Sequence, residues 1–573
     1  MTNLSAIIAP TNVVTTTGTQ TLSNKTLVAP ALGTPASGNL SNCTGIPAGS
    51  AATPTALGTV YGKQTTVGGT PFLTAIGYNA AGGTTGVGVT AVGVGALYTN
   101  STGARSTAMG YNAGYSNTGD NNLFIGNQSG FTNTTGTGNS FVGGMTSDNW
   151  PSGYYNTTGA DNSAFGGGTL IQNTTGSSNT AVGTYALYSN TTASNNTAVG
   201  YQAGKNNTTG TANVYMGYNA GRANNTGNYN IGIGREALDA NTGSSNVGIG
   251  YYAVGSNTTG ESNTGVGREA ISSNTTGGEN TALGHQALTT NTTGSYNTGI
   301  GREALKTNSS SDYNTAVGFR SLQLCTTGTQ NTAGGIQSLR RTTTGSNNTA
   351  FGVNALEANT SSTNSTAVGH NALGTATGEH NTAVGSSAMG ACTSGSYNTA
   401  IGYNAGGSGT TTGSNNTYVG YYSVPSGNGT NEIVIGTGSV VGKGSTTGFI
   451  SPGGGAVYQG NNSASWTTTS DRRLKKNIVD NNIGLEKLTQ IQVRNFEYRL
   501  PEEVTELPTH AVIKKTGVQL GVIAQELQTV LPDCVRQETT GVLSVDPDNL
   551  TWYMINAIKE LKAEFDAYKA THP

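Results

Sequence analysis

The sequence predicts a mainly β, elongated fold: a shaft of 17-residue repeats, followed by a small α+β domain that ends in a helix. Composition is the first observation, because only 34% of the 573 residues are hydrophobic and 87 are glycine, which excludes an ordinary globule for most of the chain. A short, regular repeat is the second. The third is charge: 13 of the 26 Lys and Arg and 15 of the 28 Asp and Glu follow Ser470.

The repeat is visible as Asn-Thr-Ala-Val-Gly at 179–183 and 196–200, and as Asn-Thr-Ala-Leu-Gly at 280–284. The first two segments are 17 residues apart, and this period recurs along the middle of the chain. One glycine per unit keeps the register from Gly77 to Gly436, with a single longer step between Gly143 and Gly166.

Each unit has the features of short β-strands joined by polar turns. A β-branched residue such as Val199 precedes the registered glycine, an apolar pair such as Ala287-Leu288 follows it, and Asn-Thr-Thr-Gly ends the unit. Short segments that are bounded at a fixed spacing by Asn, Thr, Ser and Gly indicate β-strands. The residue directly after the glycine varies, from Tyr201 to Arg235, so we expect it to face solvent.

A single unit has too little apolar surface to fold alone. Burial contributes about 25 cal/mol per Å², which does not offset the entropy of ordering about 17 residues. We therefore expect the units to stack and neighbouring chains to contribute, as a homotrimer. Two architectures satisfy the pattern: a β-solenoid or β-roll with one coil per unit, and a triple β-helix of three interwound chains.

These repeats resemble the head repeats of trimeric autotransporter adhesins, which are left-handed parallel β-rolls, and similar repeats in phage fibres. The resemblance implies an elongated trimer. The period here is longer than in the adhesin heads, so the handedness of the shaft stays open.

Charge and hydropathy exclude several functions. The formal net charge is -2, and the basic residues before Ser470 are scattered, so we expect no nucleic-acid partner. No apolar run is long enough for a membrane span. Residues 1–10 lack the basic and apolar regions of a secretory signal, which predicts synthesis in a cytoplasm.

The cysteines and the Asn-x-Thr triplets have simple interpretations. Cys43, Cys325, Cys392 and Cys534 share no metal-ligand or disulfide spacing, so we expect incidental thiols, no metal and no cofactor. The Asn-x-Thr triplets match glycosylation acceptors, but polar turn residues are the simpler interpretation.

Residues 1–70 lack the repeat. The segment from Ser23 to Gly45, Ser-Asn-Lys-Thr-Leu-Val-Ala-Pro through Cys-Thr-Gly, resembles N-terminal segments of phage tail fibres. The resemblance implies attachment to a virion tail or baseplate; a disordered leader is the alternative.

A candidate nucleophile lies at the start of the charged C-terminal segment, Ser-Asp-Arg-Arg-Leu-Lys-Lys-Asn-Ile at 470–478. Ser470 is a nucleophile only if a base removes its proton, and Lys475 can do so if burial or nearby cations lower its pKa. Arg473 and Lys476 are among the cations available. In the alternative interpretation, Ser470 and Asp471 form a cap or turn before a solvated basic run.

Further motifs follow in order: Gly-Leu-Glu-Lys-Leu at 484–488, Phe496 and Tyr498, and Gly-Val-Ile-Ala-Gln-Glu-Leu at 521–527. With 470–478, they resemble the intramolecular chaperone domain of phage endosialidases and of other tail spikes and fibres.

This resemblance implies self-cleavage by a serine and the lysine five positions on, here Ser470 and Lys475, with Lys476 as the second candidate base. It places the cut between Ser470 and Asp471. A serine hydroxyl more naturally attacks the preceding carbonyl, so both bonds stay open.

The last segment predicts a helix with an apolar seam of alternating four- and three-residue spacing, at Met554, Ile558, Leu561, Phe565 and Tyr568. Such spacing is typical of a coiled coil, which would align three chains. Packing of the helix against its own domain is the alternative.

We therefore predict a virion-attachment segment at 1–70, a repeat shaft at 71–436, a tip or linker at 437–469 and a chaperone domain at 470–573. The predicted protein is a trimeric phage tail fibre that binds a host receptor, expected to be a glycan. Exposed tyrosines of the repeats, such as Tyr201 and Tyr251, are either sugar-stacking residues or surface filler. The alternatives are a polysaccharide-degrading tail spike and a bacterial trimeric surface adhesin.

Overall fold

The computed structural model describes residues 72–148, 150–407, 412–452, 457–459, 470–507, 513, 515–538 and 541–573. The chain divides into two compact units, Met1–Thr467 and Thr468–Pro573. The predicted attachment segment, residues 1–70, lies outside the described residues.

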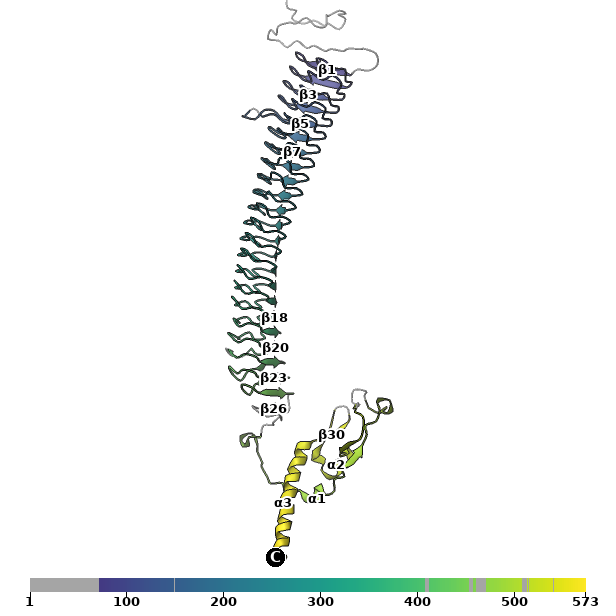
Figure 1. Cartoon of the computed structure of the whole chain (residues 1–573), viewed down its shortest axis with the longest axis vertical. Helices are drawn as coiled ribbons and strands as arrows, with labels where there is room; N and C mark the ends of the chain where they lie inside the picture. Colours follow the sequence, from purple (N-terminus) through teal and green to yellow (C-terminus); the bar gives the residue numbers. More distant parts are fainter. Residues whose placement is uncertain are drawn as a thin grey trace, which may run out of the picture. The chain divides into compact units, whose positions relative to one another are not determined.

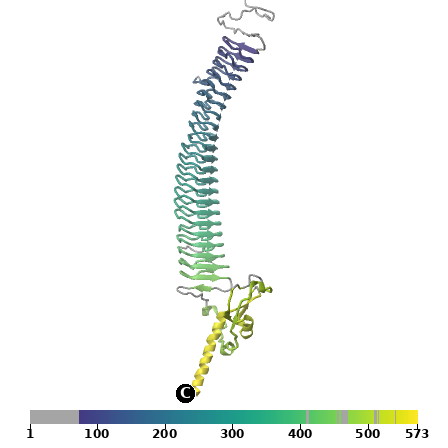
Figure 2. The same ribbon diagram turned by 45° about the vertical axis from the view of Figure 1, so that its right-hand side comes forward.

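The first unit is a β-solenoid formed within one chain (Figures 1 and 2). Each strand pairs in parallel with the strand one repeat later, so that Thr180 pairs with Thr197, Ala181 with Ala198 and Val182 with Val199. Because equivalent residues lie side by side, each 17-residue unit is one coil. The solenoid prediction is confirmed, and the interwound triple helix is not the observed architecture.

The solenoid strands are short, most of them three residues long, and belong to one sheet of 24 strands. In chain order they are β1 (Leu73–Ile76), β2 (Val89–Val92), β3 (Thr107–Met109), β4 (Leu123–Ile125), β5 (Ser140–Val142), β6 (Ser163–Phe165), β7 (Thr180–Val182), β8 (Thr197–Val199), β9 (Val214–Met216), β10 (Ile231–Ile233), β11 (Val247–Ile249), β12 (Thr264–Val266), β13 (Thr281–Leu283), β14 (Thr298–Ile300), β15 (Thr315–Val317), β16 (Thr332–Gly334), β17 (Thr349–Phe351), β18 (Thr366–Val368), β19 (Thr382–Val384), β20 (Thr399–Ile401), β21 (Thr417–Val419), β23 (Ile433–Gly436), β25 (Gly448–Ser451) and β26 (Val457–Gln459). β26 is antiparallel to β25, and a separate pair joins β22 (Ser423–Val424) to β24 (Val440–Val441).

The registered glycine is required by close contact between coils. Gly200 has φ 136°, and a Cβ atom there would lie 2.5 Å from the carbonyl oxygen of Gly217. A side chain would therefore collide with the backbone of the next coil. The glycine that recurs once per repeat is thus explained by the close stacking of the coils.

The core of each coil is small and half polar. In one coil, Ala181, Ala186 and Leu187 are fully buried, and so are Asn190 and Asn196. The apolar side chains alone would leave the coil poorly stabilised, as the composition predicted. The buried amides supply further contacts between coils.

These asparagines form ladders along the solenoid. Asn190 Nδ2 donates to Asn173 Oδ1 at 2.8 Å, and Asn207 Nδ2 donates to Asn190 Oδ1 at 3.0 Å. The interpretation as polar turn residues missed their burial, because each amide closes its own turn and also bonds to the neighbouring coil. Such stacked amides are favourable only when their hydrogen bonds are satisfied.

Two of the four cysteines occupy positions in this ladder. Cys325 Sγ donates to the carbonyl of Gly328 at 3.3 Å, in the place where Asn291 Nδ2 bonds Gly294 at 2.8 Å. Cys392 makes the same bond to Gly395 at 3.8 Å. Both side chains are buried, and Cys43 lies outside the described residues.

The β-branched residue before the glycine faces outward. In β7, Ala181 is buried whereas Val182 is 37% exposed, because successive residues of a strand point to opposite faces. Outward residues of this kind recur along the sheet, among them Ile249, Leu283, Val317 and Ile401. The solenoid therefore has an apolar stripe on its outer sheet face.

The second unit is a small α+β domain. Its helices are α1 (Leu485–Leu488), α2 (Ala524–Val530) and α3 (Pro547–Thr571), its strands are β27 (Arg494–Phe496), β28 (Gln519–Gly521), β29 (Val535–Gln537) and β30 (Leu543–Val545), and short 3-10 helices cover Arg472–Leu474, Pro501–Glu503 and Pro532–Cys534. Each strand pair is antiparallel. The buried core consists of Leu527, Leu531, Cys534, Val535 and Tyr553.

The long helix α3 begins at a well-formed cap. Asp546 accepts hydrogen bonds from the backbone nitrogens of Asp548 and Asn549, at 3.1 and 3.4 Å, and Pro547 occupies the first helical position. Both features favour a helix start. Across the described part of the chain, no helix is both long enough and apolar enough to cross a membrane.

Candidate active site

The structure brings Ser470 and Lys475 into contact. Lys475 Nζ donates a hydrogen bond to Ser470 Oγ at 2.6 Å. The turn between them produces this contact: Arg472–Leu474 form one 3-10 turn, closed by a bond from the nitrogen of Lys475 to the carbonyl of Arg472 at 3.1 Å. The five-residue spacing noted in the sequence thus corresponds to a direct side-chain pair.

Asp471 fixes the start of this turn. Its carboxylate accepts a hydrogen bond from the backbone nitrogen of Arg473 at 2.8 Å. The same carboxylate forms an ion pair with the Arg473 guanidinium at 2.6 Å. The guanidinium hydrogen bond lowers the pKa of the Asp471 carboxyl, and the same bond raises the pKa of Arg473. Arg473 therefore interacts first with Asp471, and its charge is partly compensated there.

Ser470 and Lys475 are exposed to solvent in the single chain. Ser470, Lys475 and Lys476 are all exposed. The burial that would favour a neutral lysine is therefore not provided by this chain alone. His510, the nearest imidazole along the chain after Ser470, lies outside the described residues.

Helix α3 contacts the segment that follows the pair. Asn556 Nδ2 donates to the carbonyl of Asn481 at 2.7 Å, and a Cβ atom on Gly484 would lie 2.3 Å from the nitrogen of Ala557. Only a glycine lets the chain approach the helix this closely. The helix thus anchors the chain a few residues beyond Lys475.

The predicted seam lies on a different face of α3 from the one that packs on the domain. Tyr553 and Ala557 are buried. The five seam residues are between 49% and 65% exposed: Met554, Ile558, Leu561, Phe565 and Tyr568. Packing against the helix's own domain therefore does not account for the seam.

The described residues contain no group of three or more His, Cys, Asp or Glu side chains placed to hold a metal ion. The site consists of a serine beside a lysine, joined by a short turn. Such a pair can act in nucleophilic chemistry if the lysine accepts the serine proton.

A comparison with protein families gives a match in this unit. The family model described as "chaperone of endosialidase" matches residues 470–536, so the match begins at Ser470. The C-terminal unit therefore contains an endosialidase-type chaperone domain, attached to a β-solenoid shaft. No solved structure matches the chain.

Sequence reasoning missed a second cluster of side chains, on the shaft. Trp150, Tyr185, Tyr188 and Lys205 line a hollow beside the longer step between two registered glycines. That irregular step was the available signal, because an insertion into a uniform repeat has no role in stacking.

Proposed function

We propose that this chain is a subunit of a trimeric bacteriophage tail fibre, whose C-terminal domain aligns three chains and then cuts itself off at Ser470. The contact between Ser470 Oγ and Lys475 Nζ carries the proposal. It is supported by the position of Ser470 at the first residue of the chaperone match. The β-solenoid supplies the long, repetitive shaft that such a fibre needs.

Trimer formation is supported by two apolar surfaces that stay exposed among the described residues. One is the seam of α3, with Leu561 55% exposed, and the other is the outward stripe of the solenoid sheet. Regularly spaced apolar residues of this extent favour association with identical chains. In the proposed fibre, three α3 helices pair first, and the three shafts then form in register.

The proposed chemistry is a proton transfer followed by acyl transfer. Neutral Lys475 accepts the proton of Ser470, and the serine oxygen attacks a neighbouring peptide carbonyl. The C–N bond of that peptide breaks, the amine takes the proton, and water hydrolyses the resulting ester. Attack on the preceding carbonyl leaves Ser470 on the released domain, whereas a cut after Ser470 leaves it on the shaft.

Association of chains would supply the missing burial. Exclusion of water disfavours a charged ammonium, and Lys475 is exposed on one chain. Asn556 of α3 donates a hydrogen bond to the carbonyl of Asn481, a few residues after Lys475. Pairing of the α3 helices would therefore also bring the chains together near Ser470 and Lys475. Cleavage is thereby coupled to assembly.

The proposal also includes the virion and the host. The N-terminal segment attaches the fibre to the tail or baseplate, and the fibre binds a host surface receptor, expected to be a glycan. Once the chaperone domain is released, the shaft can no longer unfold along the path by which it assembled. The mature fibre is therefore kinetically stable.

Two lysines side by side allow a matched test. We expect Ser470→Ala to abolish the cut and Lys475→Ala to slow it by at least about 100-fold, as general-base loss does. Lys476→Ala should cut normally, because Ser470 is bonded to Lys475. Denaturing gels give the rates, and intact mass of the fragments gives the scissile bond.

Undiminished cutting of Ser470→Ala would contradict the proposed nucleophile. Loss of cutting in Lys476→Ala together with normal cutting in Lys475→Ala would move the base to the neighbouring lysine.

A further inference from the structure

An insertion interrupts the solenoid at one place. The registered glycines Gly143 and Gly166 are 23 residues apart, whereas the steps on either side are 17. The strands nevertheless keep their register, because Phe141 pairs with Ala164. The sequence therefore has six additional residues in this step, and the described ones, 144–148, leave the repeat without disturbing the sheet.

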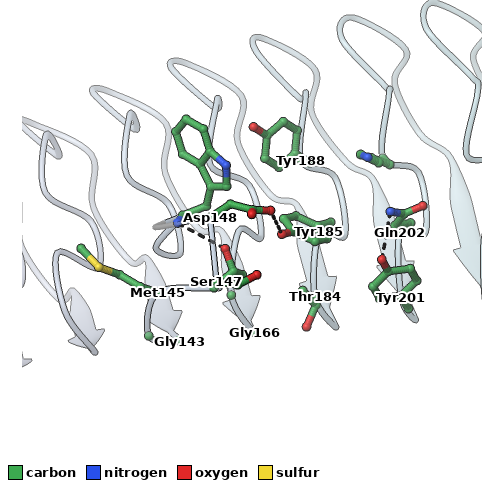
Figure 3. Close-up of a pocket in the computed structure, with 15 residues that line it drawn as sticks. Gly143, Met145, Ser147, Asp148, Gly166, Thr184, Tyr185, Tyr188, Tyr201 and Gln202 are labelled. Atoms are coloured by element: carbon green, nitrogen blue, oxygen red, sulfur yellow. Dashed lines mark hydrogen bonds between the residues drawn. The ribbon is translucent and has the colours of Figure 1, made fainter.

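An open hollow of about 920 Å³ lies between this insertion and the coils that follow (Figure 3). Gly166 and Gly167 are among the residues that line it, and the Thr146 side chain lies directly over Gly167. A Cβ atom on Gly167 would lie 2.6 Å from Thr146 Cγ2. A side chain at this position would therefore collide with the insertion.

Aromatic rings line the hollow. Trp150 and Tyr188 meet edge to face with centroids 6.1 Å apart, and Tyr185 contacts Tyr188 at 5.7 Å and Tyr201 at 6.2 Å. None of these four rings is fully buried. They come from three coils and do not belong to the solenoid core, so stacking of the shaft does not require them.

Polar groups lie among the rings. Asp148 Oδ2 accepts a hydrogen bond from the Tyr185 hydroxyl at 2.7 Å, and Gln202 Nε2 donates to the Tyr201 hydroxyl at 3.2 Å (Figure 3). The Lys205 ammonium lies 5.6 Å from the Tyr185 ring centroid. The same ammonium lies 6.0 Å from the Tyr188 ring centroid, and within the described ranges Lys205 forms no salt bridge.

From this arrangement we infer that the hollow is a carbohydrate-binding site, with hexopyranose units of a surface polysaccharide as its ligand. The C–H face of a sugar ring packs on aromatic rings such as Trp150 and Tyr188. Its hydroxyls find an acceptor in Asp148, donors in Lys205, and both in Gln202. One carboxylate and one ammonium cancel, which favours a neutral glycan over a polyanion.

The openness of the hollow fits a polymer. It lies on the side of the solenoid, and a chain can enter and leave it along the surface. The inference rests on the proposed host-attachment function and names its ligand class. It does not depend on self-cleavage.

The test is a glycan array of bacterial surface oligosaccharides, followed by titration calorimetry with the sugars that bind. We expect Trp150→Ala and deletion of residues 144–149 to lower affinity at least about tenfold. The deletion restores the 17-residue step, so the shaft should still fold. The control is Tyr296→Ala on the regular coils. Tyr296 is exposed and stacks on Tyr313 with ring centroids 5.0 Å apart, so this variant removes an aromatic ring outside the hollow.

Absence of any bound sugar, or equal binding by wild type, Trp150→Ala and the deletion, would overturn the site. A Trp150→Ala variant that changes only the oligomeric state would instead make the hollow a contact between chains. Adhesion of the fibre to host cells separates the two proposals. Sugar binding without adhesion contradicts the attachment function, whereas adhesion unchanged by Trp150→Ala contradicts this site.

Discussion

Ala198 in the shaft and Leu561 in the terminal helix are both apolar residues at regular spacing, yet Ala198 is fully buried and Leu561 is 55% exposed. Ala198 is covered by the coils before and after it in the same chain. Leu561 lies among other apolar residues of α3, but the described part of the chain leaves more than half of its surface exposed.

The two regions differ in how much of their apolar surface one chain covers. A shaft coil buries its apolar residues and its asparagine amides against neighbouring coils, so its core is complete in one chain. The C-terminal domain has a small core around Leu527 and Tyr553 and a long exposed seam. In the proposed trimer, the seam is therefore the main contact between chains, and the outward stripe of the shaft adds to it.

The largest expected effect comes from a charge in the seam. We expect Leu561→Glu to abolish trimer formation and, with it, cutting at Ser470, because a buried carboxylate opposes helix pairing. Lys559→Glu is the control, since it places a carboxylate on the same helix outside the seam. Analytical ultracentrifugation and denaturing gels measure both results; a trimer formed by Leu561→Glu would show that the seam is not the interface.

The next effect distinguishes buried from exposed asparagines. Asn207 bonds Asn190 and the carbonyl of Gly210, and it accepts a bond from Asn224. We expect Asn207→Ala to destabilise the shaft by about 3 kcal/mol, since it leaves several buried groups unpaired. The neighbouring Asn206 is exposed, and Asn206→Ala should change little. Unfolding in guanidinium measures both, and equal stability of the two variants would contradict the ladder.

The smallest effect concerns the thiols. Burial raises the pKa of Cys325 in the shaft to about 11, and burial raises the pKa of Cys534 in the domain. The thiolate is the reactive form, so both resist alkylation at pH 8 and become more reactive as the pH rises toward these values. In uncut Ser470→Ala protein, we expect rising denaturant to expose Cys534 first. Peptide mass mapping after iodoacetamide pulses shows which cysteine is labelled at the lower denaturant concentration. Labelling of Cys325 before Cys534 would contradict the prediction.

The sequence was enough to predict the strands and the glycine column. A residue such as Gly200 cannot vary where a Cβ atom would meet the next coil, so the period is visible in the sequence. The Ser470–Lys475 contact was also accessible, because it depends on one local turn.

Three features were not accessible. Asn190 and its equivalents have the composition of surface turns, and only the stacking of coils shows that both sides of each amide are occupied. Leu187 has φ 48°, a conformation that leucine rarely adopts, and tertiary contacts impose it. Spacing alone also could not show that six inserted residues would face aromatic rings two coils further on.

The role of the C-terminal domain in assembly is tested most directly by comparing two shafts that are produced in different ways. One is produced from a gene truncated at Ser470, and the other is the product of natural cutting. If the domain is needed to build the shaft and not to maintain it, the truncated chain should aggregate or assemble out of register, while the cut product should resist heat and detergent. Electron micrographs and solubility measure both. Soluble, full-length rods from the truncated gene would contradict the role of the domain in assembly.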